Sequence, residues 1–106
     1  MAVLTIGSVV FEWDDDKAAS NLSKHGISFL EAATVFRDKL GILKRDIAHS
    51  TDEDRFLLIG ISLERRIITV VHVERGERLR IISARPATPR ERRNYERRDR
   101  KGELGG

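Results

Sequence analysis

A strand that leads directly into a helix, within residues 79–96, constrains the fold of this chain more than any other feature. The segment begins with a short apolar run that carries Arg85 into a turn. Thr88 is then a suitable N-cap, Pro89 fits the first helical position, and Glu91 completes a Thr-x-x-Glu capping box. The sequence therefore predicts a strand–turn–helix unit near the C-terminal end.

The helix predicted after this turn differs from helices that fill protein cores. It has no aliphatic side chain from Arg90 to Lys101, and the ring of Tyr95 is its only sizeable apolar surface. The chain carries a net charge of only +3, yet residues 75–101 contain 11 basic and 4 acidic residues, nearly all the basic ones arginines. A solvated charged tail has a similar composition, but arginine binds phosphate bidentately, so the pattern favours a polyanion-binding surface.

The N-terminal third predicts a strand followed by two helices. Residues 9–13 form a short apolar run that ends at Asp14, a good N-cap for a helix that Gly26 stops. Ser28 opens a second helix with the capping box Ser28-x-x-Glu31. That helix has an apolar side for a sheet to cover, made of Leu30, Ala33, Val35 and Phe36.

The middle of the chain predicts short strands joined by short polar loops, which is typical of an antiparallel meander. The predicted strands are residues 41–47, 55–62, 66–74 and 78–85. We expect an α+β fold, with two N-terminal helices, an antiparallel sheet and a C-terminal helix. Residues 1–101 are expected to form a single domain and 102–106 a frayed tail, while residues 1–8 suit an added edge strand.

The chain lacks the residues that several classes of function require. The chain has no cysteine, and His25, His49 and His72 do not have the spacing of a metal site. It has no glycine-rich nucleotide-binding motif, so neither a metal nor a cofactor is expected. No signal peptide and no membrane-spanning run is evident, which predicts a soluble cytoplasmic protein.

RNA cleavage without a metal is chemically available to such a chain. The 2′-hydroxyl beside a phosphate can attack it, given a base, an acid and cations that stabilise the added negative charge. Arg66 begins one predicted strand and Arg85 ends the next, so antiparallel pairing places both at the same end of the sheet. Glu91 and Tyr95 are one helical turn apart and share a face.

Each candidate also has an explanation without catalysis. Lys24 and His25 suit the C-terminal end of a helix, and Glu91 suits its capping box. Tyr95 can anchor an otherwise polar helix, while His72 alternates with apolar residues and is expected to be partly buried. The sequence therefore does not decide which residue is the general base, and the candidates are Lys24, His25, Glu91 and Tyr95.

Two sets of residues resemble the signature of the BrnT toxin family, and together they span residues 10–97. The first set is Phe11-Glu12-Trp13-Asp14, Lys17, Asn21, Lys24-His25-Gly26, Phe29, Glu31-Ala32 and Val35-Phe36. The second set is Arg55-Phe56, Ile59-Gly60, Arg80-Ile81-Ile82-Ser83-Ala84-Arg85, Ala87-Thr88 and Glu91-Arg92-Arg93-Asn94-Tyr95-Glu96.

The resemblance implies a RelE-like fold and a ribonuclease toxin of a type II toxin–antitoxin pair. It implies a cognate ribbon-helix-helix antitoxin that binds the toxin and the DNA of the operon. The family's basic active-site positions correspond to Lys24, Arg66 and Arg85, and the same motifs carry His25, Glu91 and Tyr95 as further catalytic candidates. The expected RNA contacts are Arg65, Arg80 and Arg92.

The chain departs from the family pattern at two positions. Arg65 stands where a small residue, often glycine, usually precedes the second arginine, so either Arg65 or Arg66 can face the substrate. Pro86 replaces the commoner lysine after Arg85, which removes one cation. The alternative function is a toxin that binds nucleic acid or protein without cutting RNA, for example by blocking a topoisomerase.

Overall fold

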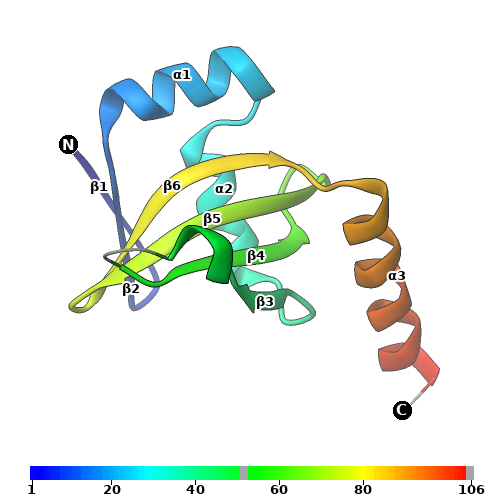
Figure 1. The fold of residues 1–106 in the computed structure, drawn as a ribbon. Helices are drawn as coiled ribbons and strands as arrows, with labels where there is room; N and C mark the ends of the chain where they lie inside the picture. Colours follow the sequence, from blue (N-terminus) through cyan, green and yellow to red (C-terminus); the bar gives the residue numbers. More distant parts are fainter. Residues whose placement is uncertain (51–52, 105–106) are drawn as a thin grey trace.

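The computed structural model describes residues 1–50 and 53–104, with side chains up to residue 98. Strands, helices and two short 3-10 helices follow one another along the chain (Figure 1). Their order is β1 (Ala2–Ile6), β2 (Val9–Trp13), α1 (Asp15–His25), α2 (Phe29–Thr34), η1 (Val35–Arg37), β3 (Ile42–Arg45), η2 (Ile47–His49), β4 (Arg55–Ile61), β5 (Ile67–Arg75), β6 (Arg78–Pro86) and α3 (Pro89–Leu104).

The strands form one six-stranded sheet in the order β1-β2-β6-β5-β4-β3. Strands β3 to β6 make the predicted antiparallel meander, and β1 is the edge strand expected within residues 1–8. The α+β class is therefore confirmed. The sheet is nevertheless mixed, because β2 lies parallel to β6, a long-range pairing that local periodicity does not encode.

Helices α1 and α2 begin and end where the capping residues predict. The Asp14 carboxylate accepts a hydrogen bond from the Lys17 backbone N–H at 3.0 Å, and Gly26 ends α1 with a left-handed φ of 68°. Helix α2 buries Ala32 and Ala33 against the sheet, but Leu30 is 57% exposed. The expectation that Leu30 packs on the sheet is wrong, because Phe29, Ala32 and Ala33 form the buried side of α2 and Leu30 lies about 100° around the helix from Phe29.

The core lies between α2 and the face of the sheet that it covers. Phe11, Ile68, Val70 and Ala84 belong to this cluster, and each is almost completely buried. Trp13 packs edge-on against Phe29 of α2, with ring centroids 5.9 Å apart. These contacts fix α2 relative to the strands that carry the candidate site.

Helix α1 attaches to an open edge of β6. Strand β2 pairs with β6 only as far as Arg80, so the rest of that edge has no strand partner. The buried Asn21 supplies the missing hydrogen bonds: its side-chain NH₂ donates to the Ala84 carbonyl at 2.9 Å, and its side-chain oxygen accepts from the Ala84 N–H at 3.0 Å. Asn21 thereby places the C-terminal end of α1 beside the end of β6.

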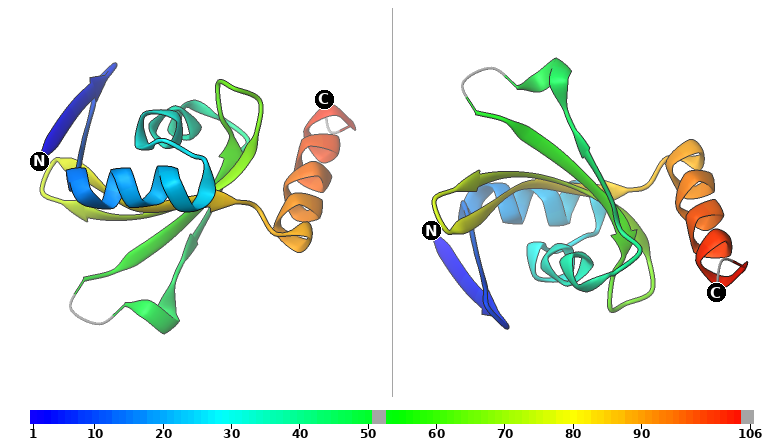
Figure 2. Two further views of the ribbon diagram at one scale, coloured as in Figure 1. Left: turned by 90° about the horizontal axis from the view of Figure 1, so that it is seen from above. Right: turned by 90° about the horizontal axis from the view of Figure 1, so that it is seen from below.

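Helix α3 stands apart from the rest of the domain and joins it at the end of β6 (Figures 1 and 2). Among its described side chains only Tyr95 is buried, which agrees with the prediction that this helix does not fill the core. Residues 102–104 of the expected tail belong to the end of α3, and residues 105–106 lie outside the described residues. No helix in the described part of the chain has the length and apolar character needed to cross a bilayer.

Candidate active site

A carboxylate holds Arg85 at the junction between β6 and α3. Its guanidinium donates two hydrogen bonds to the Glu91 carboxylate, at 2.7 and 3.1 Å. The same carboxylate accepts from the Thr88 backbone N–H at 2.8 Å, and the Glu91 N–H donates to the Thr88 hydroxyl at 3.1 Å. The predicted capping box is therefore complete, and its glutamate also orients an arginine.

Glu91 is ionised throughout the ordinary pH range. Partial burial raises the pKa of its carboxyl, but hydrogen bonds from Arg85, the Thr88 N–H and the Thr69 hydroxyl outweigh burial and bring the pKa down to about 2. A carboxylate with so low a pKa is a weak proton acceptor at neutral pH. Its geometry suits it to positioning Arg85.

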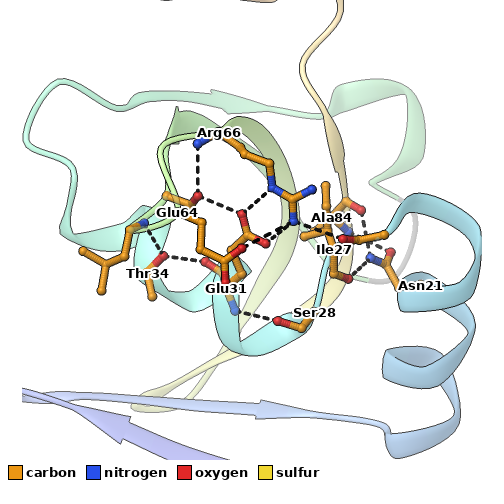
Figure 3. Close-up of polar contacts among 11 residues, drawn as sticks. Asn21, Ile27, Ser28, Glu31, Thr34, Glu64, Arg66 and Ala84 are labelled. Carbon is orange, nitrogen blue, oxygen red and sulfur yellow. Dashed lines mark hydrogen bonds and ion pairs between the residues drawn. The ribbon is translucent and has the colours of Figure 1, made fainter.

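A second glutamate holds Arg66, which immediately precedes β5 (Figure 3). The Arg66 guanidinium donates to both oxygens of Glu31, through Nε at 2.9 Å and through NH2. The NH2 group also donates to the Gly26 carbonyl at 3.0 Å, which connects β5 to the end of α1. The Ser62 hydroxyl completes the arrangement by donating to Glu31 at 2.8 Å.

The capping box predicted at the start of α2 is only half formed. Ser28 accepts a hydrogen bond from the Glu31 backbone N–H at 3.0 Å, as predicted. The Glu31 carboxylate turns to Arg66 instead of returning to Ser28, because a charged partner binds it more strongly than a backbone N–H. The hydrogen bond from Arg66 lowers the pKa of Glu31, burial opposes this, and the Ser62 hydroxyl adds to the lowering.

The two arginine–glutamate pairs lie at the same end of the sheet, as antiparallel pairing predicts. Thr69 and Arg85 are opposite each other in the register of β5 and β6. Their neighbours Ile68 and Ala84 belong to the core cluster beneath α2, so Thr69 and Arg85 point to the other face. Arg66 is held by Glu31 of α2 and Arg85 by Glu91 of α3, one pair on each side of the sheet.

Three predicted RNA-contacting or catalytic arginines line one hollow of about 270 Å³ at this end of the sheet. They are Arg65, Arg66 and Arg92, and Pro86 forms part of the wall. The side chains of Arg65 and Arg92 have no hydrogen-bond or ion-pair partner among the described residues. These two arginines are therefore the cations at this hollow that a phosphate can approach without displacing a carboxylate.

Arg65 has an unusual backbone conformation. Its φ of 64° lies in the left-handed region, which a residue with a side chain enters at a cost of about 1–2 kcal/mol. Its N–H donates to the Ser62 carbonyl at 2.9 Å and closes the turn between β4 and β5. Glycine would fit this position without strain, so the presence of arginine points to a use for its side chain.

Lys24 and His25 lie on the other side of this corner. They line a hollow of about 280 Å³ along α1 and β6, together with Asn21 and Ser83. Ser83 is two residues before Arg85 on the same strand, and the next residue after His25 is Gly26, whose carbonyl binds Arg66. The end of α1 thus lies beside the strand that carries Arg85 and contacts Arg66 through Gly26.

Two predicted site residues lie elsewhere. Arg80 pairs with Glu12 at 2.8 Å, five residues before Arg85 and so about 16 Å along β6 from the corner. Tyr95 is buried beneath α3, and its hydroxyl donates to Asp38 at 2.5 Å. Asp38 also accepts from the Ile61 N–H at 2.8 Å, so Tyr95 anchors α3 on the end of β4.

The histidines are dispersed. His72 is 3% exposed and lies between the rings of Phe36 and Phe56, in agreement with the prediction that it is buried, and burial lowers its pKa. His49 pairs with Asp46 at 3.0 Å on an exposed 3-10 helix. Within the described residues, no three histidine or acidic side chains come together in a way that can hold a metal ion.

The sequence does not predict that Glu31 orients Arg66 or that Asn21 binds the edge of β6. It places Glu31 in a capping box and in the family signature, and Asn21 in that signature only. One available signal is polarity on a helix side that the fold buries: both residues are less than 10% exposed. Asp38 carries no comparable signal, because it follows η1 in a loop.

Comparisons with known proteins identify the family and the fold. Residues 13–91 match the family described as the ribonuclease toxin BrnT of type II toxin–antitoxin systems. The fold resembles that of the Brucella abortus ribonuclease toxin BrnT, with a TM-score of 0.55 and 28% sequence identity over 72% of this chain and 92% of that one. No curated protein matches the chain. The chain therefore belongs to the BrnT family of ribonuclease toxins, which act on RNA and are paired with an antitoxin.

Proposed function

We propose that this chain is a metal-independent endoribonuclease that cleaves RNA through attack of the 2′-hydroxyl on the adjacent phosphate. The observation that carries the proposal is one end of the sheet, where glutamates orient Arg66 and Arg85 and where the unpaired Arg65 and Arg92 line a hollow together with Arg66. Cations fixed in this way stabilise the charge that develops on phosphorus without reorganising during the reaction.

The proposed reaction is a transesterification. The 2′-oxygen forms a bond to phosphorus, and the bond from phosphorus to the 5′-oxygen breaks, leaving a 2′,3′-cyclic phosphate and a 5′-hydroxyl. Arg85 and Arg66 stabilise the added negative charge, and Arg65 and Arg92 bind the neighbouring phosphates. The substrate itself supplies the nucleophile.

Two protons must move, and the end of α1 supplies the groups. We assign His25 as the acceptor of the 2′-hydroxyl proton, because histidine is the common acid–base residue near neutral pH and this one borders an open hollow. Lys24 beside it donates the proton that the departing 5′-oxygen needs. Glu91 is assigned to positioning Arg85, and Tyr95 to anchoring α3, because both are already engaged.

The antitoxin is proposed to be a ribbon-helix-helix protein that binds this chain and operator DNA, acting with it in the cytoplasm. Support for this comes from the family, whose members are paired with an antitoxin. Copurification of the chain with the product of the adjacent gene tests the pairing, and a gel shift with operator DNA tests the DNA-binding part.

Cleavage of RNA by the purified chain in EDTA tests the proposed activity. The comparison is wild type, Arg85→Ala and Arg45→Ala, because Arg45 is an exposed arginine paired with Asp54 far from the corner. We expect wild type and Arg45→Ala to cleave with 2′,3′-cyclic phosphate ends, and Arg85→Ala to lose at least about 100-fold in rate. Equal activity in all three contradicts the site. Growth arrest without cleavage by wild type supports the binding toxin instead.

A further inference from the structure

The arginines of this chain divide into two groups by their partners. Every arginine in an ion pair belongs to the body of the domain, and these are Arg45, Arg66, Arg75, Arg78, Arg80 and Arg85. Helix α3 has five arginines among its described side chains, and all five are exposed and without an ion pair there: Arg90, Arg92, Arg93, Arg97 and Arg98. In the body, Arg37, Arg55 and Arg65 also lack an ion pair among the described residues, but most arginines there have one, so the unpaired arginines are most concentrated on α3.

The two acidic residues among the described side chains of α3 do not offset this charge. Glu91 is occupied by Arg85, and Glu96 is exposed with no ion pair among the described residues. Like charges three or four positions apart destabilise a helix by about 0.2–0.5 kcal/mol per pair. Such repulsion reduces stability in the free protein and is relieved when a polyanion binds.

Helical geometry places three of these arginines on one outward stripe. Tyr95 and Glu91 point to the body, as their contacts with Asp38 and Arg85 show. At 3.6 residues per turn, the opposite side of the helix carries Arg90, Arg93 and Arg97. Helix α3 stands away from the sheet (Figure 2), and the stripe lies on the side of the helix opposite its contacts with the body.

We infer that Arg90, Arg93 and Arg97 form a second phosphate-binding surface, which holds the backbone of RNA outside the cleavage corner. The inference rests on the proposed function for the identity of the polyanion. Arg92 lines the hollow at the corner and Arg93 follows it on the outer side, so the two surfaces are separated by the width of one helix, about 10 Å. An RNA strand that leaves the hollow around the start of α3 reaches the stripe directly.

The side chains of the stripe suit binding to the RNA backbone and do not suit recognition of a base sequence. Guanidinium groups bind phosphates bidentately, and the stripe offers no aromatic ring on which a base can stack. Its ligand is therefore the phosphodiester chain of single-stranded RNA, bound without sequence preference. The family match ends at residue 91, so all of the stripe except Arg90 lies beyond the matched segment.

The test separates binding from cleavage. The binding probe is a long homopolymer RNA methylated at every 2′-oxygen, which the proposed reaction cannot cut. Its affinity is measured by fluorescence anisotropy across a range of salt concentrations for wild type and for the triple variant Arg90→Gln/Arg93→Gln/Arg97→Gln. The control variant Arg45→Gln/Arg55→Gln/Arg75→Gln removes the same charge from the body. Cleavage of an unmodified tetranucleotide is measured in parallel.

We expect the triple variant to bind the long RNA on the order of tenfold more weakly, with a salt slope reduced by about 2, since each single-strand phosphate contact contributes about 0.7. The control variant should keep most of the wild-type slope, and tetranucleotide cleavage should be unchanged. An unchanged salt slope in the triple variant overturns the inference, and so do equal losses of RNA affinity in the triple variant and the control variant. A triple variant that loses antitoxin binding but keeps the RNA slope also overturns it, and assigns the stripe to the protein partner.

Failure of the proposed ribonuclease activity has a different signature. Wild type then leaves the tetranucleotide intact, while the methylated RNA still reports on the stripe through its salt slope. Circular dichroism of the triple variant checks that α3 is retained, since glutamine keeps helix propensity close to that of arginine.

Discussion

Glu91 accepts two hydrogen bonds from Arg85 and, with the same carboxylate, one from the backbone N–H of Thr88. One side chain therefore both starts α3 and orients the arginine at the end of β6. The position of the helix and the geometry of the cation are coupled, because neither can change without breaking contacts of the other.

Replacement of Glu91 by glutamine removes the charge that Arg85 requires. The pKa of Glu91 is about 2 in the folded chain, below its ordinary value of 4.5, so its contribution to stability is complete above pH 4.5 and is lost as the pH falls toward 2. We expect Glu91→Gln to lower the free energy of unfolding by about 2–3 kcal/mol at pH 7. Urea unfolding from pH 3 to pH 7 should show that the difference in free energy of unfolding between Glu91→Gln and wild type becomes smaller below pH 4.5. Glu96→Gln, on the exposed side of α3, is the control, and an equal loss there contradicts the role of Glu91.

The pair formed by the buried Glu31 and the exposed Arg66 can be tested by a double-mutant cycle. Glu31→Gln leaves Arg66 without its charged acceptor and should cost about 2 kcal/mol, together with a fall in cleavage rate. Combining Glu31→Gln with Arg66→Met should cost less than the sum of the single changes, by at least about 1 kcal/mol. Strict additivity in chemical denaturation would show that the two side chains are not energetically coupled.

Arg65 allows backbone strain to be separated from charge. Arg65→Gly removes the side chain from a left-handed position and should raise the free energy of unfolding by about 1 kcal/mol. Arg65→Ala keeps the strain and should bring no such gain. Both variants lose the same cation at the hollow, so both should bind RNA more weakly with similarly reduced salt slopes. A stabilised alanine variant would contradict the strain, and unchanged RNA binding would contradict the use of the side chain.

Replacement of Tyr95 by phenylalanine distinguishes an anchor from a catalyst. The change removes the hydrogen bond to Asp38 and should lower stability by about 2 kcal/mol, since that bond has a charged acceptor. Cleavage should stay within about threefold of wild type at a temperature where both are folded, whereas loss of an acid–base group costs about 10²–10⁴-fold. A rate loss in that larger range would return Tyr95 to the catalytic residues.

His72 predicts a separate pH effect in the core. Burial lowers its pKa below the ordinary 6.5, so folding favours the neutral ring and stability is complete above about pH 6.5. As the pH falls below that value, we expect the free energy of unfolding to decrease by up to about 1.4 kcal/mol per pH unit until the folded-state pKa is reached. His72→Phe should abolish this decrease. His49→Gln, which changes an exposed histidine, should retain it, and a loss of the effect in that variant would contradict the assignment to His72.

Local signals located most elements of this fold. Asp14, Gly26, Thr88 and Pro89 mark helix ends through hydrogen bonds and backbone angles that depend on nearby residues only. The meander was predictable for the same reason, because short polar loops leave antiparallel pairing as the simple solution. The parallel contact of β2 with β6 joins residues nearly seventy positions apart, and no local pattern specifies it.

The candidate site likewise combines features that the sequence predicts with features that depend on packing. The sequence by itself determined which cations the chain owns, that Arg66 and Arg85 meet at one end of the sheet, and that α3 is too polar for a core. Only the tertiary structure decided which arginines have a carboxylate partner. The Glu31 carboxylate binds Arg66 instead of completing its capping box, and Glu12 pairs with Arg80, away from the corner. Hydrogen bonds between charged groups depend on distance and burial, and these are set by how α2, α3 and the strands pack.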